Sequence, residues 1–138
     1  MKKNSVKIWA IYLLAAGSLM ACGTQDIQTG NLNVIPLPQE IVETPSAAPF
    51  VINSSTTICY EEGNEKLAGT ARMLAGYIKE VTGTEVKIGT KAGKNCIILK
   101  VDPSITHKEG YELNVSVDVI TLTGATEAGV FYGWQTIH

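Results

Sequence analysis

The residues of this chain that could carry out chemistry are few and scattered. His107 and His138 are the only histidines, and His107 has no carboxylate or cysteine near it at metal-ligand spacing. Glu61 and Glu62 form an acid pair, but they stand before a predicted helix whose positive end they suit. Such patterns indicate a solvated loop histidine and acids at a helix end, rather than a catalytic centre.

Three glycines near the end of the sequence raise the question of a phosphate-binding loop. Gly124, Gly129 and Gly133 lack the Gly-Lys-Ser/Thr ending of such a loop and the spacing of a dinucleotide fingerprint. Gly129 and Gly133 lie four positions apart on a predicted helix, and we expect them to let that helix approach a neighbouring backbone closely. We therefore expect no catalytic residue, no cofactor and no metal site.

Two cysteines lie in apolar, strand-like runs, Cys59 within Thr57–Tyr60 and Cys96 at the start of Cys96–Val101. In an exported protein they could form a disulfide if their Cα atoms come within about 7 Å of each other. The alternative, which we favour, is two buried free thiols that pack as small hydrophobes. The absence of a Cys-x-x-Cys motif gives no indication of zinc or thioredoxin-like chemistry.

The elements that would position these residues follow from the spacing of apolar side chains. A helix is predicted from a cap at Asn64 to Thr82, with Gly83 at the position where a helix-ending glycine belongs. Its apolar stripe recurs every three or four residues. The members of the stripe are Leu67, Ala71, Leu74, Ile78 and Val81.

Short apolar or alternating runs predict the strands. Those runs are 49–52, Thr57–Tyr60, 85–88, Cys96–Val101, Tyr111–Val115 and 119–123. The run Cys96–Val101 is almost continuously apolar, which is typical of a central strand, and residues 116–118 suggest a hairpin between the last two runs. The order of elements predicts an α+β fold: a single small domain with a mixed β-sheet and two helices packed on one face.

A second helix is predicted within residues 124–138. Val130, Trp134 and Ile137 share the spacing of one apolar helix face, with Phe131 beside them. No helix-ending glycine, asparagine or proline follows in the sequence. We expect this helix to pack against the sheet of its own domain and against a further domain. The residues assigned to this packing are Gly129, Val130, Phe131, Gly133, Trp134 and Ile137.

The N-terminal part of the sequence has the design of an export signal. Three lysines precede an apolar run over 8–20, which is shorter than the about 20 residues of a membrane span. Residues 19–22, Leu-Met-Ala-Cys, resemble a bacterial lipobox, in which Cys22 would become the lipid attachment site. We expect export and lipid anchoring to a bacterial membrane, facing the periplasm or the cell surface. The expected divisions are a lipoprotein signal peptide at 1–21, a flexible tether at 22–33 and a folded domain at 34–138.

Charge narrows the range of partners. Removal of the three lysines in 1–21 would take the formal net charge from −2 to −5. A mildly acidic surface argues against nucleic acid as a partner, and against binding through an anionic membrane surface. The expected contact with a membrane is therefore the lipid anchor alone.

Three motifs in order resemble the N-terminal, non-catalytic domain of bacterial β-N-acetylhexosaminidases of glycoside hydrolase family 20. Residues 35–40, Ile-Pro-Leu-Pro-Gln-Glu, resemble its Pro-x-Pro-Gln opening. Residues 109–115 resemble its Glu-Gly-Tyr-x-Leu strand, and residues 124–137 resemble its closing helix. A related domain with similar signatures occurs in family 84 glycosidases, which is the alternative assignment.

The resemblance implies hydrolysis of terminal N-acetylhexosamine residues by substrate-assisted retention, an exception to the usual two-carboxylate scheme. The substrate's 2-acetamido oxygen attacks the anomeric carbon, an Asp orients that group, and a neighbouring Glu is the general acid and base. In the family both acids belong to a (β/α)8 barrel of about 250 residues, so none of them is assigned to this sequence of 138 residues.

We therefore expect a truncated chain that is inactive alone and whose partner is a missing or separately encoded barrel. A stand-alone, lipid-anchored module that binds a glycan or a protein is a second hypothesis. A small self-contained enzyme is a third, which the lack of an acid/base set disfavours. Trp134 is the only tryptophan outside the signal region, so an aromatic platform for sugar binding is not indicated.

Overall fold

The computed structural model of the protein describes residues 39–42 and 48–136. The predicted signal peptide, the tether, Cys22 and Ile137 lie outside the described residues, as does most of the 35–40 motif. Within the described part, no helix combines the length and the apolar character that crossing a membrane requires.

Five strands and two helices make up the described fold. In chain order they are β1 (Thr57–Tyr60), α1 (Glu65–Thr82), β2 (Lys87–Gly89), β3 (Cys96–Val101), β4 (Tyr111–Val115), β5 (Val119–Gly124) and α2 (Glu127–Gln135). The strands form one sheet in the order β2-β1-β3-β5-β4. The predicted central strand is therefore confirmed as β3, and the predicted hairpin is confirmed as β4 and β5.

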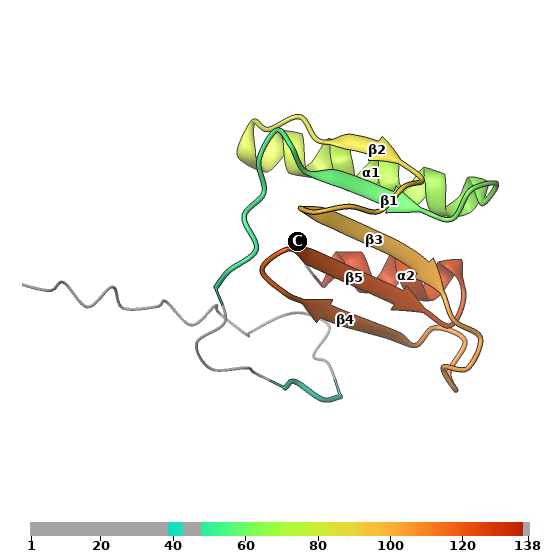
Figure 1. Ribbon diagram of the computed structural model, residues 1–138. Coiled ribbons are helices and arrows are strands. Elements are labelled where there is room, and N and C mark those ends of the chain that lie inside the picture. Colours follow the sequence, from blue (N-terminus) through green and yellow to red (C-terminus); the bar gives the residue numbers. More distant parts are fainter. Residues whose placement is uncertain (1–38, 43–47, 137–138) are drawn as a thin grey trace, which may run out of the picture.

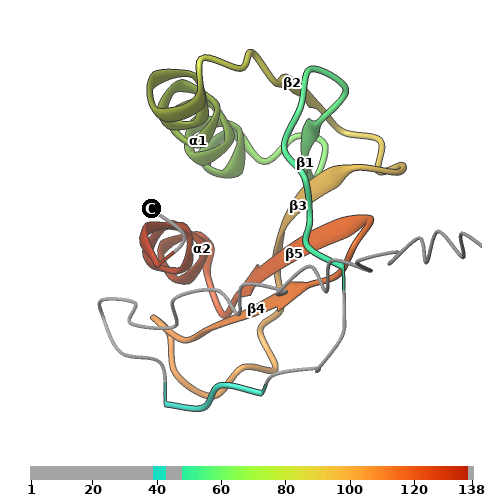
Figure 2. The same ribbon diagram turned by 90° about the vertical axis from the view of Figure 1, so that its left-hand side faces the viewer.

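The sheet is mixed, because one of its edge strands runs against the others. β1 pairs in parallel with β2 and β3, and β3 pairs in parallel with β5. Only the hairpin pair of β4 and β5 is antiparallel. Both helices lie on the same face of this sheet, α1 over β1 and β2 and α2 over β5 and β4 (Figure 1 and Figure 2). The α+β fold with two helices on one face is thus confirmed.

Helix α1 begins and ends where its sequence predicts. The side-chain oxygen of Asn64 accepts a hydrogen bond from the Leu67 N–H at 3.1 Å, which satisfies a donor of the first turn. Gly83 takes a left-handed conformation with φ of 72°, and its N–H donates to the Lys79 carbonyl oxygen at 2.9 Å. A glycine suits this position because it has no Cβ to strain the left-handed backbone.

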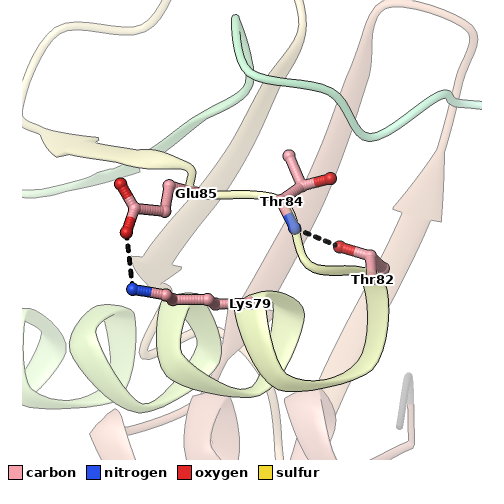
Figure 3. Close-up of polar contacts among 4 residues, drawn as sticks. All are labelled: Lys79, Thr82, Thr84 and Glu85. Atoms are coloured by element: carbon pink, nitrogen blue, oxygen red, sulfur yellow. Dashed lines mark hydrogen bonds and ion pairs between the residues drawn. The ribbon is translucent and has the colours of Figure 1, made fainter.

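Polar contacts connect the last turn of α1 with the segment that leads to β2, as Figure 3 shows. The Lys79 ammonium forms an ion pair with the Glu85 carboxylate, and the Thr84 N–H donates to the Thr82 hydroxyl at 3.1 Å. The lysine and the glutamate are both largely exposed, so the pair marks the helix end rather than stabilising the fold strongly.

The core lies between the helices and the sheet. It is built from the inward stripe of α1, from alternate residues of the strands, and from two residues of α2. Its members are Ile58, Leu67, Ala71, Leu74, Ile78, Ile97, Leu99, Ile120, Leu122, Val130 and Trp134. Val81 was predicted to belong to the stripe, but its side chain is 62% exposed. It lies in the last turn of α1, so its apolar spacing continues beyond the part of the helix that the core covers.

The strand predicted at 49–52 is wrong. This segment forms no strand, and Val51 is exposed. β1 already has a partner on each side, β2 and β3, so no free edge of that strand remains for a further ladder. Phe50 and Ile52 nevertheless pack against the core, which explains the apolar character that suggested a strand.

Candidate functional site: the two faces of the helix layer

Helix α2 turns its inward face to the sheet of its own domain. Val130 and Trp134 are buried in the core. The Trp134 ring lies 6.0 Å from the Tyr77 ring of α1 and 6.1 Å from the Phe131 ring, measured between centroids. Val130 and Trp134, two of the residues assigned to packing, are therefore buried within their own domain.

The glycines of α2 bring it close to the neighbouring elements, at Gly129 to main-chain atoms and at Gly133 to side chains. A methyl group on Gly129 would overlap the carbonyl oxygen of Gly110, and one on Gly133 would come within 2.5 Å of the Leu122 side chain and 2.9 Å of the Tyr111 ring. Any larger residue at either position would push the helix off β4 and β5. The predicted close approach of helix and backbone is confirmed at Gly129, whereas Gly133 faces side chains of the sheet.

Both ends of α2 are tied to the β4 side of the sheet. At the start, the Thr126 hydroxyl accepts from the Gly129 N–H at 3.4 Å and donates to the Lys108 carbonyl oxygen at 2.7 Å. At the end, the hydroxyls of Thr136 and Tyr111 share a hydrogen bond of 2.7 Å. The helix is therefore held in one position, which fixes the direction of its outward side chains.

The outward face of the helix layer consists of small, apolar and aromatic residues, which lie beside exposed charged residues of α1 such as Arg72 and Glu80. We use this name for Gly69, Met73 and Gly76 of α1 together with Ala128, Phe131 and Tyr132 of α2. Met73 is 52% exposed and Tyr132 is 41% exposed. No other helix or strand among the described residues lies beyond this face, which is on the left in Figure 2.

The part that α1 takes in this face was missed by the sequence reasoning, which assigned packing to α2 alone. Gly69 and Gly76 lie seven positions apart, with Met73 between them, so the three share one side of the helix. A methyl group on either glycine would meet no atom within 4 Å. The available signal was the pair of glycines inside a helix, where each costs about 1 kcal/mol relative to alanine.

The polar residues considered for chemistry do not form a catalytic arrangement. His107, Glu61 and Glu62 are all exposed, as a surface role predicts. No group of three or more histidine, cysteine, aspartate or glutamate side chains within 39–42 and 48–136 could hold a metal ion.

Glu127 shows what the acids at the helix starts do instead. Its carboxylate accepts from the Asn64 side-chain amide at 3.3 Å, which links the beginnings of the two helices. A hydrogen bond from its own main-chain N–H and the bond from Asn64 lower the pKa of this carboxyl group. The residue thus stays ionised beside the positive helix end, which is a structural role.

The sequence matches glycosyl hydrolase family 20, domain 2, over residues 31–138. It is 31% identical over 129 residues to the β-hexosaminidase of Porphyromonas gingivalis, a match that covers 87% of this chain and 16% of that protein. The chain therefore belongs to glycosyl hydrolase family 20 and corresponds to the N-terminal, non-catalytic domain that the three motifs indicate.

Solved structures of the family have the same fold. The β-N-acetylhexosaminidase of Streptomyces coelicolor matches with a TM-score of 0.58 and 28% identity, over 75% of this chain and 20% of that one. A β-hexosaminidase of Streptomyces plicatus matches with a TM-score of 0.57 and 29% identity, over the same shares. The chain thus spans about a fifth of these relatives or less, and in enzymes of this family the catalytic barrel is separate from this domain.

Proposed function

We propose that this chain serves as the accessory N-terminal domain of an exported, lipid-anchored β-N-acetylhexosaminidase, with the catalytic acids on a separate (β/α)8 barrel. The match to family 20 over residues 31–138 carries this proposal. The substrate class would be glycans with terminal N-acetylhexosamine, because the relatives are β-hexosaminidases. The lipobox-like residues 19–22 support the anchor.

The outward face of the helix layer supplies the contact with the barrel. Gly69 and Gly76 offer a close approach to another backbone, and Met73 between them offers a flexible apolar side chain. Phe131 and Tyr132 extend the apolar surface onto α2, and their rings lie 5.9 Å apart. Exposed aromatic and methionine side chains are enriched where protein surfaces associate.

Catalysis by the domain alone is not supported by its described residues. All described acids except the half-buried Glu127 are exposed, so their carboxyl groups lie in contact with water rather than in a closed pocket. We expect the purified 138-residue chain to leave an aryl N-acetyl-β-glucosaminide intact. Turnover by this chain, absent from a preparation of an unrelated protein made in the same way, would overturn this part of the proposal.

The docking role is tested in a chimera. Residues 31–138 replace the matching segment of the P. gingivalis β-hexosaminidase, and hydrolysis of the aryl glycoside is measured. We expect an active chimera that loses activity or thermal stability when Met73→Glu or Tyr132→Glu is introduced, because a charge would be buried in the interface.

Val117 provides the matched control for this experiment, because it is 55% exposed but lies in the β4–β5 turn, outside the outward face. Val117→Glu should leave the chimera unchanged. Equal effects of all three substitutions would contradict docking through the helix layer.

A further inference from the structure

The face of the sheet opposite the helices holds two buried thiols. Cys59 of β1 is 2% exposed, Cys96 of β3 is 1% exposed, and both are free. Side chains alternate along a strand, and the neighbours Ile58 and Ile97 belong to the core on the helix side. The sulfur atoms of Cys59 and Cys96 lie 3.9 Å apart.

The strand register sets these cysteines too far apart for a disulfide. Thr57 stands opposite Cys96, and Cys59 stands opposite Ile98, so the cysteines are offset by two positions on neighbouring strands. With about 4.8 Å between strands and about 3.3 Å of rise per residue, their Cα atoms are separated by roughly 8 Å. A disulfide requires less than about 7 Å, so the thiols face each other without being able to join.

Main-chain groups of the loop at 90–95 surround the two sulfurs. The Cys59 thiol donates to the Lys91 carbonyl oxygen at 3.1 Å, and the Gly93 N–H donates to the Cys96 sulfur at 3.0 Å. The Lys94 carbonyl oxygen lies 3.6 Å from the same Cys96 sulfur. Two sulfurs and two carbonyl oxygens therefore converge under one loop.

The end of that loop is fixed in place. The Thr56 hydroxyl donates to the Asn95 side-chain oxygen at 2.8 Å, and the Asn95 side-chain amide donates to the Val51 carbonyl oxygen at 3.2 Å. Asn95 also holds a left-handed backbone with φ of 53°. Hydrogen bonds of Asn95 therefore hold the loop, and with it the polar groups around the two sulfurs, in a fixed position.

We propose that Cys59 and Cys96 form a two-sulfur site for a soft monovalent cation of the copper(I) class. Thiolates select copper(I) among the first-row metals, and the two sulfurs already lie 3.9 Å apart, within the about 4.6 Å that two metal–sulfur bonds of about 2.3 Å, the length of zinc–sulfur bonds, can span. Structural zinc takes four protein ligands, and no group of three acidic, histidine or cysteine side chains within the described ranges provides them.

Binding is an exchange of protons for the metal, with no change of oxidation state. One copper(I) ion and two neutral thiols give a two-coordinate dithiolate with a single negative charge, and two protons are released to solvent. Burial, and then the neighbouring Cys96 thiol, raise the pKa of the Cys59 thiol to about 11. Hard cations such as magnesium prefer oxygen ligands and would not displace these protons.

Competition with a bidentate copper(I) chelator under anaerobic conditions tests the site. The full chain carries Cys22→Ser, so that Cys59 and Cys96 are its only thiols. We expect one copper(I) ion per chain, with a Kd on the order of a hundredfold tighter than in the same chain with a further Cys59→Ser or Cys96→Ser. The second thiolate binds as an intramolecular ligand at high effective concentration, which is the reason for the difference.

Circular dichroism checks that each single-thiol variant is folded, and X-ray absorption of the two-thiol chain counts the sulfur neighbours of copper without any further substitution. Two sulfur neighbours are expected. A Kd equal to that of the single-thiol chains, or a copper ion without two sulfur neighbours, would overturn the proposal. Formation of an internal disulfide in the folded chain on mild oxidation would do the same, because it would refute the register argument.

Discussion

The two helices each contain a pair of glycines, and the pairs have opposite surroundings. On α2, a methyl group at Gly129 or Gly133 would collide with the sheet side of the domain. On α1, a methyl group at Gly69 or Gly76 would meet nothing within 4 Å. The packing of this domain therefore explains the glycines of α2. The glycines of α1 lower helix propensity, and no contact among the described residues requires them. A close contact with a surface of another domain would explain them.

The largest expected effect tests the inward pair. Gly129→Ala should lower the free energy of unfolding by about 2 kcal/mol or more, because the new methyl group meets main-chain atoms of Gly110 that cannot rotate away. This loss exceeds the gain of about 1 kcal/mol in helix propensity. Urea unfolding measures it. An unchanged or raised stability would show that α2 is not held tightly against the sheet.

A second test compares apolar side chains on the two faces. Val130→Ala should cost about 2 kcal/mol, because Val130 is fully buried and the surrounding core would keep part of the cavity. Met73→Ala should change the stability of the isolated chain by less than about 0.5 kcal/mol, because that side chain is half exposed. Thermal unfolding of both variants measures the contrast, and similar losses would remove the distinction between the faces.

A third test concerns substitutions that should raise, rather than lower, the stability of the isolated chain. Gly69→Ala and Gly76→Ala should each stabilise the isolated chain by up to about 1 kcal/mol, since both gain helix propensity in open space. In the chimera with the P. gingivalis barrel, the same substitutions should lower stability or activity by blocking the close approach. Stabilisation in both settings would separate the α1 glycines from any docking role.

The smallest expected effect lies at the end of α1. The hydrogen bond and charge of Lys79 lower the pKa of the Glu85 carboxyl group, so the ion pair is present above the ordinary carboxyl range and is lost as the pH falls through the lowered pKa. Lys79→Met should return this pKa towards its usual value in an NMR titration, with little change in melting temperature. A large loss of stability would mean that this exposed end supports the fold more than the inward face of α2 does.

Local features were predictable from the sequence. The Asn64 cap and the Gly83 end of α1 depend on hydrogen bonds within a few residues, so the pattern was sufficient. The same holds for the β4–β5 hairpin and for the apolar face of α2. Motif resemblance located the domain within its family, which spacing alone could not do.

Features that depend on distant partners were not predictable. Residues 49–52 have the composition of a strand, yet β1 has no free edge to receive them. The offset of Cys59 and Cys96 follows from pairing between strands separated by α1 and β2. The predicted stripe of α1 puts Gly69 and Gly76 on the opposite side of the helix, but spacing within one helix cannot indicate a surface of another domain that would meet them.

The place of β3 in the sheet has a consequence for how the chain folds. β1, α1 and β2 form one unit of neighbouring elements, and β4, β5 and α2 form another. Within the sheet only β3 joins them, through parallel ladders to β1 and β5. Because long loops must close before such ladders form, we expect each unit to gain structure early and β3 to join them late. Leu99→Ala, deep in β3, should then accelerate unfolding far more than it slows refolding.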